Sequence, residues 1–91
     1  MSGHLSVETL QQRLAEAEQQ VKIGARYRHY KDSTKTYRAK ELVIIEATDQ
    51  IGVVYVPEYV EGLAFMRPLS NWLDKVDWGG QTVNRFTFIE N

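Results

Sequence analysis

The chain has 91 residues, a formal net charge of -1, and no cysteine. This length allows one domain with a single core, and the absence of cysteine excludes disulfides, thiolate metal ligands and cysteine nucleophiles. No apolar run approaches the length of a membrane span, and no signal-peptide pattern follows the first residues. We therefore expect a cytoplasmic domain that folds without a cofactor.

The N-terminal part predicts a disordered leader over residues 1–5 and a helix over residues 6–22. Ser6 is a good capping residue, and apolar side chains recur behind it at helical spacing, at Leu10, Leu14, Ala17 and Val21. This narrow apolar stripe has two explanations. It packs against its own domain, or it pairs with the same helix of a second chain, so the protein is a monomer or a homodimer.

From residue 24 onward, alternating apolar residues are typical of β-strands. Strands are predicted over residues 24–31, 36–48, 51–57, 63–67, 76–78 and 81–89. They are separated by a polar turn at 32–35, a short helical turn near 70–75 capped by Ser70, and a two-glycine turn at Gly79-Gly80. Gly52 indicates a bulge or a close backbone approach. Because the strand over 36–48 is long for so small a domain, we predict that it bends within a β-barrel or roll.

Charge is distributed unevenly along the predicted strands. Residues 24–40 contain six bases and one acid, a balance of +5, whereas residues 41–64 contain five acids and no base, a balance of -5. Opposite charges on antiparallel neighbours attract, so internal pairing is the favoured interpretation. The alternative is an anion-binding face on the first hairpin.

The segment 24–31 has the densest chemistry of the chain. Strand alternation places Tyr27 and His29 on one face and Arg26, Arg28 and Tyr30 on the other. We take as candidate ligand-binding residues four side chains of this segment and three from later in the chain, namely Arg28, His29, Tyr30, Lys31, Arg67, Trp72 and Arg85.

The arginines and the histidine of this set have structural as well as functional interpretations. Arg67 and Arg85 lie in apolar surroundings, where a guanidinium needs either a carboxylate from residues 41–64 or an anionic ligand. His29 has no Cys and no spaced pair of carboxylates near it, so no metal site is predicted. A hydrogen-bonded structural histidine is favoured over an acid or base catalyst.

Four motifs stand in a characteristic order: G-x-x-Y-x-H-Y-K at residues 24–31, V-V-Y at 53–55, R-P-L at 67–69 and R-F at 85–86. Together they resemble a bacterial family of small proteins, domain of unknown function sixteen fifty-three (DUF1653), over residues 24–89. The chain departs from the family pattern at Asp32, where glycine is usual, and at Phe65-Met66, which replace W-V. The resemblance implies an SH3-like barrel or roll and brings no activity with it.

These observations support three functional hypotheses. The first is a non-catalytic binding module, with an anionic small molecule or a protein as its partner. The second is an enzyme or enzyme accessory acting on a phosphorylated small molecule, with Arg67 and Arg85 as anion clamps and His29 as acid or base. The third is a structural homodimer built on the N-terminal helix. Nucleic acid is not favoured, because the whole chain is slightly acidic.

Overall fold

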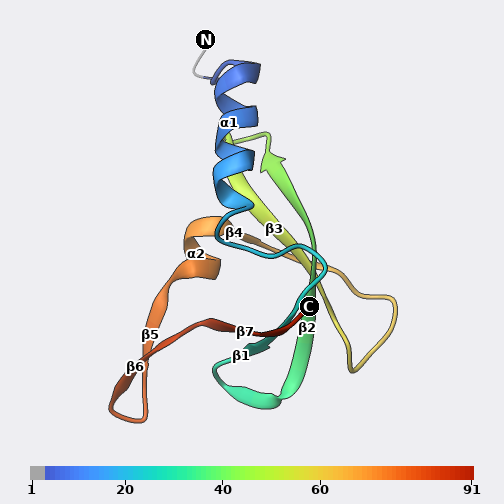
Figure 1. Ribbon diagram of the computed structural model, residues 1–91, viewed down its shortest axis with the longest axis vertical. Helices are drawn as coiled ribbons and strands as arrows, with labels where there is room; N and C mark the ends of the chain where they lie inside the picture. The colour runs from blue at the N-terminus through green and yellow to red at the C-terminus, as the bar shows by residue number, and fades with distance from the viewer. Residues whose placement is uncertain (1–3) are drawn as a thin grey trace.

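The computed structural model describes residues 4–91, which form two helices and seven strands. Their order along the chain is shown in Figure 1. The elements are α1 (Val7–Ala17), β1 (Arg26–His29), β2 (Asp32–Ile45), β3 (Gln50–Pro57), β4 (Phe65–Pro68), α2 (Leu69–Leu73), β5 (Lys75–Trp78), β6 (Gln81–Asn84) and β7 (Phe86–Glu90). Neither helix is long and apolar enough to cross a membrane.

Five strands form an antiparallel sheet in the order β4-β3-β2-β1-β7, and β5 pairs with β6 in a separate two-stranded ribbon. The predicted mostly β class is confirmed, but the closed form of the predicted SH3-like barrel or roll is wrong, because the sheet is open. After β4 the chain enters α2 and then the β5–β6 hairpin, which extends away from the main sheet (Figure 1). Because the chain leaves the sheet there, β4 and β7 do not pair and remain the two edges of an open sheet.

The predicted polar turn over 32–35 is wrong, because the first hairpin turns earlier. His29 pairs with Asp32, so the turn consists of Tyr30 and Lys31. β2 therefore begins at Asp32 and is a strand of 14 residues. It pairs with β1 along its first half and with β3 along its second half, and its register shifts between Ala39 and Glu41. The long strand stays within one sheet, where it is the central strand.

The N-terminal helix is shorter than predicted. Its start is confirmed, because the Ser6 hydroxyl accepts a hydrogen bond from the Thr9 amide at 3.1 Å. The helix ends at Ala17, and tight turns follow in place of the predicted helix to residue 22. The Val21 amide donates to the Ala17 carbonyl at 3.0 Å, and Val21 is only 1% exposed. Leaving the helix thus lets Val21 enter the core.

Part of the predicted leader is held in place. Residues 1–3 lie outside the described residues. His4 and Leu5 both contact the carboxylate of Asp49, in the turn between β2 and β3, at 3.0 Å from the His4 ring and 2.7 Å from the Leu5 amide. Asp49 has a positive φ of 59°, an uncommon backbone conformation that aspartate tolerates better than most residues.

The core lies between the sheet and α2 and is largely aromatic. Trp72 of α2 is 2% exposed and stacks on Phe86 of β7, with ring centroids 3.8 Å apart and planes 5° apart. Tyr27 and Tyr55 meet the Trp72 ring edge-on. Smaller side chains complete the cluster, namely Val21, Ala25, Ala39 and Val53. The core therefore fixes the positions of strands β1, β3 and β7.

In the last part of the chain one predicted turn is confirmed, whereas the predicted Ser70 cap and the predicted strand over 81–89 are wrong. Gly79 and Gly80 have positive φ angles of 62° and 80°, so the two-glycine hairpin turn is confirmed. The short helix follows Pro68 directly, and Ser70 lies inside it without capping it. The predicted strand 81–89 breaks at Arg85, because the Arg85 amide donates to Asp74 and its carbonyl accepts from Tyr30, each at 3.0 Å.

Candidate anion-binding pocket

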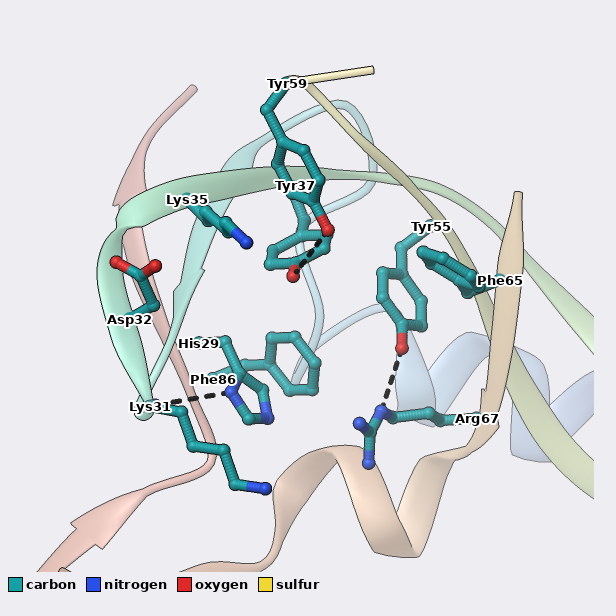
Figure 2. A pocket seen from close by; sticks show the side chains of 10 residues that line it. All are labelled: His29, Lys31, Asp32, Lys35, Tyr37, Tyr55, Tyr59, Phe65, Arg67 and Phe86. Carbon is teal, nitrogen blue, oxygen red and sulfur yellow. Dashed lines mark hydrogen bonds between the residues drawn. The ribbon is translucent and has the colours of Figure 1, made fainter. Parts of the chain in front are cut away.

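A pocket of about 420 Å³ lies at the end of the sheet where the β1–β2 turn faces β3, β4 and β7. Figure 2 shows the side chains around it. We call it the aromatic pocket. Five of its ten lining residues are aromatic and five are polar: Tyr37, Tyr55, Tyr59, Phe65 and Phe86, and His29, Lys31, Asp32, Lys35 and Arg67.

The aromatic side chains form a buried inner surface and a more exposed rim. Tyr55 and Phe86 belong to the core and are 5% and 7% exposed, whereas Tyr59 and Phe65 are 50% and 40% exposed. The hydroxyl groups of Tyr37 and Tyr59 lie 3.2 Å apart. Burial, together with this hydrogen bond, raises the pKa of Tyr37 to about 12. The Tyr37 phenol is therefore neutral at physiological pH and adds no negative charge to the pocket.

Arg67 is held in a fixed orientation at one side of the pocket. Its Nε donates to the Tyr55 hydroxyl at 2.8 Å, and its Nη1 donates to Asn71 Oδ1 at 2.6 Å. Its guanidinium carbon lies 5.3 Å from the centre of the Phe86 ring. A guanidinium has five N–H donors in all. Among the described residues only two of those donors have partners, so Arg67 can still donate to a ligand.

His29 faces the same space with a neutral ring. The Lys31 amide donates to His29 Nδ1 at 3.3 Å, so Nδ1 is the acceptor and the ring proton belongs on Nε2. Burial lowers the pKa of His29, and the positive charges of Arg67, Lys31 and Arg85 lower it further. Nε2 is hidden from solvent and has no hydrogen-bond partner among residues 4–91. His29 therefore adds no positive charge to the pocket at neutral pH.

The lining of the aromatic pocket is positively charged. Lys31, Lys35 and Arg67 contribute three positive charges and Asp32 one negative charge, a balance of +2. Hydrogen bonds from the Thr34 hydroxyl and amide lower the pKa of Asp32, which keeps it ionised. Within the described part of the chain, none of the three cations has an ion-pair partner. The field in the pocket therefore favours an anionic ligand.

The remaining basic side chains of β1 and β2 behave differently, because two of them are paired internally. Glu58 accepts from Arg26 Nε at 2.8 Å, from Thr36 at 2.7 Å and from Arg38 Nη2 at 3.1 Å. These hydrogen bonds lower the pKa of Glu58 to about 2. Internal pairing, the favoured interpretation of the charge asymmetry, thus describes part of the sheet. Arg26 and Arg38 pair with Glu58, whereas Lys31 and Lys35 line the aromatic pocket.

Of the sequence-predicted site residues, the structure brings His29, Lys31 and Arg67 together around the aromatic pocket. Tyr30 lies next to this group, with its ring 4.5 Å from that of His29 and 5.2 Å from that of Trp78.

The other three predicted residues lie elsewhere. Arg28 is exposed, and strand alternation places it on the face of β1 opposite His29. Trp72 is part of the core, where it stacks on Phe86. Arg85 is close enough to lower the pKa of His29, but it does not line the pocket. Its Nε is buried without a partner in the described part of the chain.

Sequence reasoning did not select Lys35 or the five aromatic residues that line the pocket. The signal that could have identified some of them is alternation along the strands, because residues two apart on a strand point to the same face. Lys35 and Tyr37 are two residues apart on β2, and Phe65 and Arg67 are two residues apart on β4, so each pair shares a face. The position of Phe86 opposite His29 depends on the pairing of β1 with β7, which are far apart in the sequence.

The side chains of the aromatic pocket differ from those of a metal site. Among residues 4–91, no group of three or more His, Asp or Glu side chains is placed to hold a metal. The pocket instead offers aromatic surface beside three cations that have no ion-pair partner in the described part of the chain.

Comparison with known proteins gives the same family as the sequence motifs. The profile of a family described as protein of unknown function (DUF1653) matches residues 25–88. A crystal structure of a DUF1653 protein from Bordetella bronchiseptica is similar, with 35% identity and a TM-score of 0.68. The match covers 79% of this chain and 91% of that chain. No match was found among curated proteins. From its family profile and its similarity to this solved structure, the chain belongs to the DUF1653 family.

Proposed function

We propose that the protein is a binding module that takes a ligand with a carboxylate or phosphate group into the aromatic pocket. The observation that carries this proposal is the way the Arg67 guanidinium is held. Its guanidinium is fixed by Tyr55 and Asn71, faces an aromatic surface, and retains free donors. A fixed guanidinium binds an oxyanion strongly because little side-chain entropy is lost on binding.

The rest of the lining defines the kind of anion. Lys31 and Lys35 add positive charge, and they repel a cationic ligand. Lys35 lies over the Tyr59 ring, with its Nζ 5.0 Å from the ring centre, so a cation of the protein already occupies that aromatic face. Phe86, Tyr55 and Phe65 offer apolar surface next to these charges. The ligand therefore combines an oxyanion with an apolar or planar part.

The volume agrees with such a ligand. At about 420 Å³ the pocket is within the range of about 300–1,000 Å³ that is typical of small-molecule sites. An inorganic anion alone would leave most of the aromatic surface uncovered. We therefore expect phenyl phosphate to bind more tightly than inorganic phosphate.

The proposal is tested by NMR titration of the ¹⁵N-labelled protein with phenyl phosphate, inorganic phosphate and benzyl alcohol. Phenyl phosphate should shift the amide signals of His29, Lys31 and Arg67, and benzyl alcohol should not, because it lacks the oxyanion. Arg67→Gln should weaken phenyl phosphate binding about tenfold, as expected for a lost charge-assisted hydrogen bond.

Arg28→Gln is the matched control, because Arg28 is an exposed arginine on the opposite face of β1. It should leave the affinity unchanged. Equal losses in the two variants would mean that only general positive charge attracts the anion. No shift of pocket amides with phenyl phosphate would refute the proposal. Lys31→Gln provides a second test if Arg67→Gln does not fold.

A further inference from the structure

We infer that the oxyanion belongs to an acidic side chain of an extended peptide segment, which binds by pairing with β4 as an added strand. This inference rests on the proposed function of the aromatic pocket and names the class of ligand. It is carried by the position of β4 in the sheet, the direction of its side chains and the charge of the pocket.

β4 is an edge strand with one unpaired side. On one side it pairs with β3, with Phe65 opposite Tyr55 at one end and Pro68 opposite Gly52 at the other. No strand of the described chain pairs with its other side. An edge strand has a row of unused N–H and C=O groups that an extended peptide can join. Phe65 and Met66, at the start of this strand, are 40% and 47% exposed, so β4 is accessible from solvent.

The same strand contributes side chains to the aromatic pocket. Phe65 and Arg67 alternate with Met66, and both line the pocket, as Figure 2 shows. Neighbouring strands lie about 4.8 Å apart, and their side chains point to the same faces in register. Every second side chain of an added strand would therefore lie beside Phe65 or Arg67 on the pocket face. An acidic residue at such a position would reach the free donors of Arg67.

The positive charge of the pocket favours an acidic peptide segment, and it favours the β4 edge of the sheet over the β7 edge. The pocket lining carries a balance of +2. The opposite edge, β7, contributes only the uncharged Phe86 to that lining, and it ends at Glu90, whose carboxylate lies 3.5 Å from Arg26. An acidic strand at β7 would meet that carboxylate, whereas at β4 it meets Arg67, which has no ion-pair partner among residues 4–91. The exposed Leu63 just before β4 adds apolar surface for residues flanking the acid.

The experiment uses pools of short blocked peptides with a fixed central residue and random flanking residues. The central residue is glutamate in one pool and glutamine in a matched pool. Retention on the immobilised full chain is compared, and the amide shifts of the ¹⁵N-labelled protein are mapped. We expect about tenfold greater retention of the glutamate pool, with shifts at β4 and the pocket. Arg67→Gln should remove this preference.

Peptide N-methylation distinguishes strand pairing from simple charge attraction. In an added strand, alternate peptide amides face β4 and the others face solvent. Retained glutamate peptides are therefore resynthesised with single N-methyl groups at successive positions. Methylation at alternate positions should abolish binding, and methylation at the positions between them should leave it unchanged.

Three outcomes would overturn the inference: equal retention of the two pools, loss of binding that does not alternate, or shifts at β7 in place of β4. Phenyl phosphate is measured in parallel. If it binds in the pocket while the glutamate pool does not, the peptide inference fails and the proposed function stands. If neither binds, both fail.

Discussion

Arg67 donates from Nε to the hydroxyl of Tyr55 at 2.8 Å, and this bond crosses from edge strand β4 to the neighbouring strand β3. Tyr55 is 5% exposed and belongs to the core. A polar side chain of the pocket is thereby fixed to the buried core. Binding of an oxyanion by Arg67 should therefore depend on a hydroxyl group that is not itself needed for contact with the ligand.

Tyr55→Phe tests this dependence. The substitution keeps the ring and removes the acceptor, so Arg67 loses one of its two anchors. We expect affinity for phenyl phosphate to fall about fivefold and the free energy of unfolding to fall by about 1 kcal/mol. NMR titration and urea denaturation measure the two effects. Tyr30→Phe, outside the pocket lining, should leave the affinity unchanged. An unchanged affinity in Tyr55→Phe would show that Asn71 alone orients Arg67.

Glu58→Gln tests the internal charge cluster. The Glu58 carboxylate is shared by Arg26, Arg38 and Thr36, and its pKa in the folded state is about 2, against an ordinary value of 4.5. Because the folded pKa is lowered, this stabilisation is present above pH 4.5 and is lost as pH falls towards about 2. At neutral pH the substitution should cost about 1 kcal/mol of unfolding free energy.

The pH dependence separates this cluster from a general effect of charge. In urea denaturation series, the difference between the native chain and Glu58→Gln should shrink as pH falls from 4.5 towards 2. Glu61→Gln is the matched control, because Glu61 has no ion pair within residues 4–91. A constant difference across this pH range would contradict the assignment of the stabilisation to the ionised Glu58.

Local signals in the sequence predicted the elements better than their ends or their pairing. The Ser6 cap and the Gly79-Gly80 turn were predicted, because each depends on neighbouring residues only. The end of α1 was not predicted, because Val21 continues the helical spacing. In the folded chain Val21 is buried in the core through a turn after the helix. Tertiary packing overrides the local pattern at that point.

The candidate site was predicted only in part, because local sequence identifies its residues but not the strand pairing that brings them together. His29 and Lys31 are close in sequence, and the R-P-L motif identified Arg67, so three pocket residues were recognised. Phe86 was not, because its place opposite His29 follows from pairing between β1 and β7. The open sheet was also missed. The helical turn and the two-glycine hairpin were predicted, but strand lengths did not indicate that they would lie outside the main sheet and leave it open.

Gly52→Ala tests how closely the outer face of the sheet is packed. Gly52 was predicted to mark a bulge or a close approach, and its pairing with Val43 and Pro68 shows no bulge. A Cβ atom at this position would lie 2.9 Å from Met66 Sδ and 3.1 Å from Ile45 Cγ1. We expect a loss of about 1–3 kcal/mol of unfolding free energy, measured by urea denaturation.

The double variant Gly52→Ala with Met66→Ala shows whether this loss is steric. Met66 is 47% exposed, so its removal alone should cost little. If the clash with Met66 causes the destabilisation, the double variant should recover part of the stability. A double variant no more stable than Gly52→Ala would place the clash at the β2 side chains Ile45 and Val43, whose carbons lie 3.1 and 3.2 Å from the added Cβ.

The two histidines of the chain should titrate in opposite directions from the ordinary value of 6.5. The hydrogen bond to Asp49 raises the pKa of His4, and burial lowers the pKa of His29. NMR titration of the ring signals measures both in one sample. At neutral pH the nitrogen shifts should also show His29 with its proton on Nε2, because Nδ1 accepts from the Lys31 amide.

The same shifts give opposite effects on stability. The raised pKa of His4 gives stabilisation that is present below pH 6.5 and is lost as pH rises through its folded value. The lowered pKa of His29 gives stabilisation that is present above pH 6.5 and is lost as pH falls through its folded value. In urea denaturation series, His4→Gln should therefore lose stability on acidification more steeply than the native chain, and His29→Gln less steeply. If the stability curves of both variants run parallel to that of the native chain, then neither the His4–Asp49 contact nor the burial of His29 persists in solution.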